Sequence, residues 1–119
     1  MIKAQPSTKL DLDFFESILL FNALTDQEYL SSIISYVEPS FFNDKSIGRV
    51  IDGISKFFTE RGSVPTVTEI KARLTSEEDK KALADVKPKL AQLEGPFNKD
   101  ELIQNTEKFL KERFVYKTI

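Results

Sequence analysis

Apolar side chains recur every three or four residues along most of this chain, which is the spacing of one face of an α-helix. The pattern is clearest in one central stretch, where the apolar positions are Ile47, Val50, Ile51, Ile54, Phe57 and Phe58. Similar stripes run over residues 13–24, from residue 25 to Pro39, over 67–74, over 76–93, and from residue 98 onward. Pro88 lacks the amide hydrogen that a helix interior uses, so it is expected to kink or split the fifth helix. The pattern therefore predicts six or seven helices in an all-α fold.

Short polar motifs mark where these helices begin. In a capping box, a Ser or Thr hydroxyl accepts a hydrogen bond from a first-turn amide, and a Glu three residues later accepts one from the amide of the cap residue. This spacing occurs at residues 25–28 (TDQE), 66–69 (TVTE) and 75–78 (TSEE). The expected cap residues are Thr25, Asn43 or Asp44, Thr66, Thr75 and Asn98. Gly62 is expected to end the third helix in the left-handed conformation.

Size and composition indicate one compact domain. With 119 residues, 40% of them hydrophobic and 30% charged, the chain can enclose a single core. We expect residues 1–12 to form a flexible arm and residues 13–119 to form a helical head domain, a bundle of about six or seven helices. The last helix runs to Ile119 without a terminating Gly, Asn or Pro, so the head is expected to continue into a longer chain.

The sequence shows neither a membrane-spanning helix nor a signal peptide. Its apolar stretches are shorter than the roughly 18 residues of a membrane-spanning helix. Residues 1–12 also lack the apolar centre of a signal peptide. We therefore expect a cytoplasmic protein with no membrane contact.

The charge is low and unevenly distributed. The net charge is −2, and residues 1–60 carry five Lys or Arg against nine Asp or Glu, whereas residues 61–119 carry twelve against ten. Strong non-specific binding to nucleic acid requires a broad basic field, which this balance does not supply. No strong direct binding of nucleic acid is expected.

The residue types that carry most enzyme chemistry are missing or scattered. The chain contains no His and no Cys, so the commonest proton shuttle and the thiolate nucleophile are absent. Its four glycines are isolated, whereas a phosphate-binding loop needs clustered glycines before a helix. The acidic groups at residues 11–16, 77–79 and 100–101 lack the calcium-loop pattern and are interpreted as solvated helix starts. We expect no catalysis, no cofactor and no metal site.

Aromatic residues are the other conspicuous feature, with ten Phe and three Tyr. Most lie at core spacing, but Phe41, Phe42 and Phe97 lie in predicted connections, and Tyr116 lies near the end of the last helix. Phe41 and Phe42 have two interpretations. They either form a docking patch for a partner or cover the core between two helices.

The order of several short segments resembles one protein family. The segments are 25–30 (TDQEYL) after the opening helix, 39–42 (PSFF), 62–66 (GSVPT) after a long helix, and 106–109 (TEKF) followed by Arg113. Together they are similar to the amino-terminal domain of DnaB-type hexameric replicative DNA helicases, especially those of T4-like phages. The resemblance covers about residues 15–119.

The resemblance implies a non-catalytic head in the cytoplasm of a host cell, normally followed by a helical hairpin, a linker and a RecA-like ATPase motor. In that family the heads associate with one another in a collar that supports the hexamer and helps to receive the primase. By this resemblance, we expect an edge that continues toward the hairpin and a docking patch. The candidate interface residues are Phe41, Phe42, Arg113, Phe114, Tyr116 and Ile119.

A second interpretation uses residues 54–74 differently. This stretch also looks like the first half of a winged helix-turn-helix, in which Lys71 and Arg73 would face DNA. The sequence that follows lacks the alternating strands of a wing, and Arg73 is the main side chain suited to a base edge. A DNA-binding or adaptor domain is therefore kept as the alternative.

Overall fold

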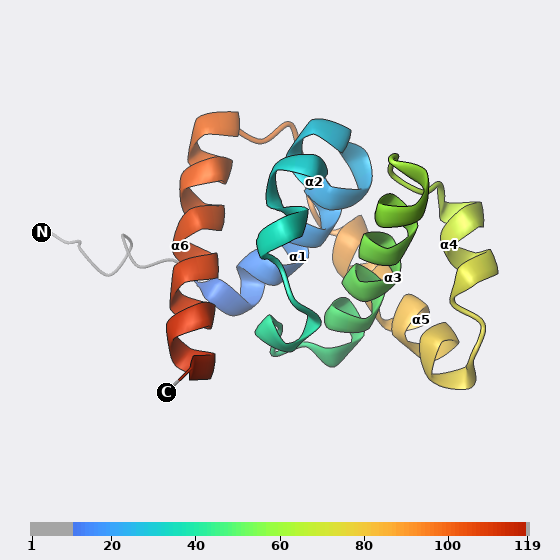
Figure 1. Cartoon of the computed structure of the whole chain (residues 1–119). Coiled ribbons are helices and arrows are strands. Elements are labelled where there is room, and N and C mark those ends of the chain that lie inside the picture. Colours follow the sequence, from blue (N-terminus) through green and yellow to red (C-terminus); the bar gives the residue numbers. More distant parts are fainter. Residues whose placement is uncertain (1–10, 119) are drawn as a thin grey trace, which may run out of the picture.

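A computed structural model describes the backbone of residues 11–118 and the side chains of residues 11–115. Within this range the chain is all-α, as the apolar spacing predicts, with six α-helices and two short 3₁₀ helices (Figure 1). The elements are α1 (Leu12–Thr25), α2 (Gln27–Ile33), η2 (Ile34–Tyr36), η3 (Pro39–Phe41), α3 (Lys45–Arg61), α4 (Val67–Arg73), α5 (Glu77–Ala91) and α6 (Lys99–Thr118). The predicted flexible arm lies mostly outside the described residues, and its last residue, Leu12, already belongs to α1.

The predicted helix starts are right in some places and displaced by one residue in others. Asp44 caps α3, Asn98 accepts from the amide of Glu101, and Thr66 with Glu69 forms the predicted capping box of α4. The predictions for Thr25 and Thr75 were wrong, because Asp26 and Ser76 are the cap residues of α2 and α5. Thr25 remains in the last turn of α1, where its hydroxyl donates to the carbonyl of Phe21 at 2.9 Å.

The predicted helix ends are also right at some positions and wrong at others. Gly62 ends α3 in the left-handed region with φ of 75°, as predicted. The second helix ends at Ile33, well before Pro39, and passes into the 3₁₀ turn η2. Pro88 does not split α5, which continues through it to Ala91. Since a proline in the last turn of a helix removes a single hydrogen bond, the helix can continue around it.

The core lies between α1, α3 and α5. α1 buries side chains on most of its surface, including Phe15, Leu19, Leu20 and Ala23, so it is central to the core. α3 packs against α5, η3, α1 and α4. Two of its glycines allow close approach: a Cβ at Gly48 would lie 2.8 Å from the carbonyl oxygen of Pro39, and one at Gly53 would lie 2.9 Å from a methyl of Leu74.

α6 lies at one edge of the molecule and packs chiefly against η3 and α1 (Figure 1). The opposite edge is formed by α4, so the two edges are separated by the core helices. Among the described residues, no helix combines the length and the apolar character needed to cross a membrane.

Candidate functional site

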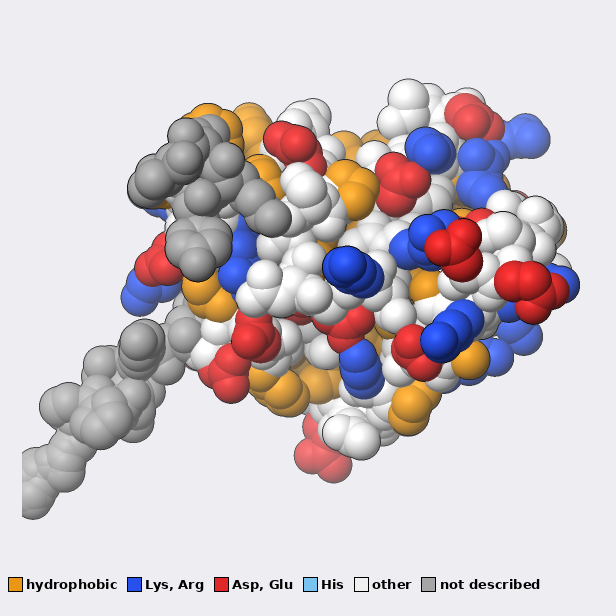
Figure 2. Space-filling view, turned by 90° about the horizontal axis from the view of Figure 1, so that it is seen from below, with side chains coloured by type: hydrophobic (Ala, Val, Ile, Leu, Met, Phe, Trp, Pro, Cys, Tyr) orange, Lys and Arg blue, Asp and Glu red, His pale blue; other side chains and the backbone are white. Residues whose placement is uncertain are grey.

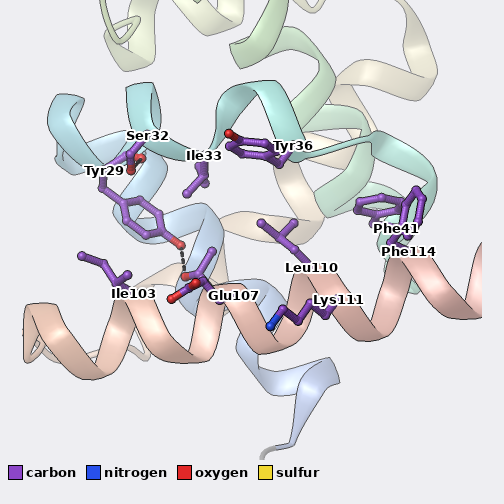
Figure 3. A pocket seen from close by; sticks show the side chains of 11 residues that line it. Tyr29, Ser32, Ile33, Tyr36, Phe41, Ile103, Glu107, Leu110, Lys111 and Phe114 are labelled. Carbon is purple, nitrogen blue, oxygen red and sulfur yellow. Dashed lines mark hydrogen bonds between the residues drawn. The ribbon is translucent and has the colours of Figure 1, made fainter.

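An apolar groove runs between α6 and the segment formed by α2, η2 and η3 (Figure 3). Its volume is about 600 Å³. One wall comes from α6, and the other comes from residues of the 29–41 segment, which approaches α6 across the groove. The lining residues are Tyr29, Ser32, Ile33, Tyr36, Phe41, Ile103, Thr106, Glu107, Leu110, Lys111 and Phe114.

The base of the groove is fixed by a buried hydrogen bond between α2 and α6. The hydroxyl oxygens of Tyr29 and Thr106 are 2.7 Å apart. Thr106 also donates to the carbonyl of Leu102 at 2.7 Å, so its single hydroxyl hydrogen is used and Tyr29 is the donor to Thr106. Burial raises the pKa of the Tyr29 hydroxyl to about 12, and the contact with Thr106 only partly offsets this effect. Tyr29 therefore stays neutral and holds the two walls together.

The rim of the groove carries large apolar side chains that face solvent. The exposed fractions are 67% for Tyr36, 49% for Ile103 and 58% for Phe114. Isolated exposed apolar residues are common, but three around one apolar groove form the kind of surface that marks a binding site. Glu107 and Lys111 lie between Ile103 and Phe114 on the same wall (Figure 3). Helical spacing alone puts Ile103 and Phe114 in one apolar stripe with the buried Leu102 and Phe109, and the structure places them at the exposed border of that stripe.

A buried ionic network holds the second half of α6 in place. Glu16 of α1 is fully buried and accepts hydrogen bonds from Arg113 at 2.9 Å, from the amide of Asn43 at 2.8 Å and from the amide of Asp44 at 3.0 Å. Burial raises the pKa of Glu16 above its ordinary value of 4.5, while the two amides and Arg113 favour the ionised form and partly offset the burial. The interpretation of Glu16 as a solvated acid at a helix start was wrong, because this carboxylate joins α1, α6 and the start of α3.

Aromatic packing completes the attachment of α6. The ring of Phe109 lies 5.8 Å from that of Phe15 and 5.6 Å from that of Phe42, measured between centroids. The guanidinium of Arg113 lies 5.1 Å from the centroid of the same Phe109 ring. These contacts lie on the inner side of α6, behind the groove.

The structure separates the six predicted interface residues. Phe41 and Phe114 both line the groove, although only Phe114 is exposed. Phe42 and Arg113 are buried, with Phe42 packed on Phe109 and Arg113 bonded to Glu16. The side chain of Tyr116 and the whole of Ile119 lie outside the described residues. The burial of both Phe41 and Phe42 agrees with the interpretation that they cover the core.

The spacing of residues along the sequence does not reveal the groove. Tyr36 lies within the stretch from residue 25 to Pro39 that the pattern predicts as the second helix, and Glu107 and Lys111 lie at polar positions of the last predicted helix. A signal was present in the sequence: Ile103, Leu110 and Phe114 are spaced by seven and four residues, which is helical spacing. The same spacing is typical of a buried core stripe, so the sequence alone cannot distinguish a core stripe from the wall of an exposed groove.

The residues of the helix-turn-helix interpretation lie at the opposite edge. Arg73 of α4 bonds to Glu60 of α3 at 2.7 Å, and its guanidinium lies 5.5 Å from the centroid of the Phe57 ring. Lys71 is exposed. Figure 2 shows basic and acidic side chains interleaved over the face that it displays, without a continuous basic area. The guanidinium most suited to a base edge is thus already engaged within the protein.

Within residues 11–118, no three acidic side chains are grouped closely enough to hold a metal ion. Comparison with protein-family models, with curated proteins and with solved structures gives no match to this chain.

Proposed function

We propose that this chain is a non-catalytic assembly head that binds other proteins through the groove along α6. The observation that carries the proposal is the coincidence of an apolar groove with three exposed apolar rim residues, Tyr36, Ile103 and Phe114. Large apolar side chains around a preformed concave surface supply contact area at low entropic cost. The polar groups of the groove base bond to each other, which favours a role in shape rather than in chemistry.

We further propose that the head belongs to the collar of a DnaB-type replicative helicase ring, in the cytoplasm of a phage-infected cell. This step is supported by the resemblance of the segments at residues 25–30, 39–42, 62–66 and 106–109 to that family. In this assignment the head contributes to hexamer assembly and primase docking, and unwinding belongs to a motor outside these residues. Phe114 is the exposed candidate interface residue that would contact the partner, and the buried Phe41 lines the groove beside it.

The proposal is tested by co-sedimentation of the purified chain with a DnaB-type helicase ring of a T4-like phage, and with its primase. The groove variant is Ile103→Ser with Phe114→Ser. The matched control is Val67→Ser, which removes an equally exposed apolar side chain, 62% exposed, from α4 at the other edge. We expect the unaltered chain and the control to bind and the groove variant not to bind. Equal binding by the unaltered chain and both variants would contradict the groove as the docking site, and binding by none of the three proteins would contradict the helicase assignment.

The alternative makes a different prediction for nucleic acid. Fluorescence anisotropy with duplex and single-stranded DNA at low salt should show no tight, strongly salt-dependent binding by this chain. Such binding, abolished by Arg73→Ala but not by the groove variant, would support the DNA-binding alternative instead.

A further inference from the structure

We propose that the groove is filled by α6 of a second copy of this chain, and that the two α6 helices pack antiparallel about a two-fold axis. This inference rests on the proposed docking role of the groove. The arrangement of charged and apolar residues on the α6 wall indicates which partner fits the groove.

The groove-facing side of α6 has apolar residues at its two ends and opposite charges between them. Ile103 lies toward the start, Phe114 toward the end, and Glu107 and Lys111 between them, with Leu110 also facing the groove (Figure 3). The two charges therefore lie inside an apolar stripe. A partner that covers this stripe must supply apolar contacts at both ends and must neutralise one negative and one positive charge.

The charges of Glu107 and Lys111 are available to such a partner. On α3, Asp52 and Lys56 have the same spacing of four residues and form an ion pair at 3.0 Å. In the described part of the chain, Glu107 and Lys111 form no ion pair with each other or with other residues. Covering both with a wholly apolar surface would remove them from water without compensation, which is costly.

A second α6 meets all of these requirements in one register. Glu107 and Lys111 lie two residues before and two residues after position 109. When a two-fold axis passes at that level, on the groove side of the helix, Glu107 of each copy lies opposite Lys111 of the other. Ile103 is six residues before position 109 and Phe114 is five after it, so the apolar ends of the two stripes also meet, and Leu110 lies close to the axis.

The alternative orientation is unfavourable. In a parallel pair, Glu107 would lie beside Glu107 of the second copy and Lys111 beside Lys111, and like charges in contact oppose association. α6 lies at one edge of the molecule (Figure 1), and Ile103 and Phe114 on its groove side are exposed to a second helix. The antiparallel pair is also isologous, which is the commonest symmetry of soluble homo-oligomers.

The test reverses one charge at a time and then mixes the variants. Sedimentation equilibrium over a wide concentration range should show a reversible dimer for the unaltered chain. Glu107→Lys alone and Lys111→Glu alone each place like charges opposite one another twice per dimer, so each should weaken the dimer about tenfold or more. An equimolar mixture of the two variants should recover a heterodimer of nearly the original strength, because one copy then carries two positive charges and the other two negative charges.

The control for charge alone is Lys108→Glu, an exposed position of α6 that does not line the groove, and it should leave the dimer unchanged. A chain that stays monomeric at every concentration, or a mixture that associates no better than its separate components, would overturn the two-fold pair. If such a monomer still co-sediments with the helicase ring through the groove, only the pairing fails and the proposed function stands. If the heterodimer forms as expected but no variant binds the ring, the helicase assignment fails and the pairing stands.

Discussion

The interior around α1, α3 and α5 and the edge formed by α6 use apolar residues in different ways. In the interior, large side chains such as Leu19, Ile51 and Ile54 are almost completely buried. α6 buries Leu102 and Phe109 on its inner side but leaves Ile103 and Phe114 at the rim of the groove. The same residue types therefore stabilise the fold in one region and remain available for a partner in the other.

Different side chains of α6 therefore attach the helix to the core and remain available for docking. Three internal features hold this helix: the Phe109 ring cluster, the Glu16–Arg113 pair and the Tyr29–Thr106 hydrogen bond. None of them requires the side chains at the groove rim. Changes on the inner side should therefore lower the free energy of unfolding, whereas changes at the rim should affect association and leave the monomer stable.

The largest expected contrast compares two phenylalanines of α6. Phe109→Ala removes a fully buried ring and should lower the free energy of unfolding by about 3–5 kcal/mol. Phe114→Ala removes a ring that is 58% exposed and should change it by less than about 0.5 kcal/mol. Urea unfolding at low protein concentration, where association is minimal, measures both. A large loss of stability in Phe114→Ala would show that the rim is part of the core.

A second contrast compares the two carboxylates that bond to Arg113, the buried one of Glu16 and the exposed one of Asp13. Each carboxylate oxygen of Glu16 accepts from an N–H donor, so Glu16→Gln places an amide nitrogen against a donor in either orientation. It should cost about 3 kcal/mol of unfolding free energy. Asp13→Asn keeps the oxygen that accepts from Asn43 and Arg113 at an exposed site, and should cost less than about 0.5 kcal/mol. Equal costs in thermal or urea unfolding would contradict the central role given to Glu16.

A third contrast uses the two close-approach glycines of α3. Gly48→Ala would place its methyl 2.8 Å from the backbone oxygen of Pro39, which cannot move without displacing η3, and should cost about 1–3 kcal/mol. Gly53→Ala would meet the end of the Leu74 side chain at 2.9 Å, which can rotate, and the helix gains about 1 kcal/mol from alanine. We expect Gly53→Ala to leave the free energy of unfolding nearly unchanged. Equal destabilisation by the two variants in urea unfolding would contradict this distinction between a fixed backbone neighbour and a side chain that can rotate.

The smallest expected effect concerns acid stability at the contact between the start of α2 and the start of α6. The hydrogen bond from Lys99, followed by that from the amide of Tyr29, lowers the pKa of Asp26 below 3.8. A lowered folded-state pKa means that Asp26 stabilises the fold above pH 3.8 and that this contribution is lost as the pH falls below it. Because Asn at position 26 can still cap α2, the main effect of Asp26→Asn should be that the free energy of unfolding falls less steeply as the pH is lowered.

Unfolding midpoints over a series of acidic pH values measure this change. Asp100→Asn, one residue after Lys99, removes an equal charge without touching the cap, and its acid profile should match that of the unaltered chain. An unchanged profile for Asp26→Asn would contradict the role of the Lys99 contact.

Features of the fold that depend on neighbouring residues could be predicted from the sequence. The left-handed Gly62 and the Thr66–Glu69 box depend on residues within one helical turn, and both are confirmed. At residues 25–26 two adjacent polar residues can each cap a helix, and the local pattern does not rank them. Asp26 is the cap because Thr25 continues α1.

Features that depend on distant residues could not be predicted. Glu16 is buried because Arg113, 97 residues later, supplies a positive charge at the same place. The groove exists because Tyr29 bonds to Thr106, 77 residues away, and leaves Ile103 and Phe114 beside the contact rather than beneath it. Helical spacing identifies an apolar stripe, but only the packing of α2 against α6 decides which part of the stripe is covered.

The central claim, that the groove along α6 is a docking surface for a second copy, is tested most directly by residue-resolved nuclear magnetic resonance during dilution. Amide shifts that depend on concentration should be confined to the groove walls, at Ile33, Tyr36, Ile103, Glu107 and Phe114, while those of α4 and α5 stay constant. Shifts that do not change with concentration, or that change mainly on α4 and α5, would contradict the claim.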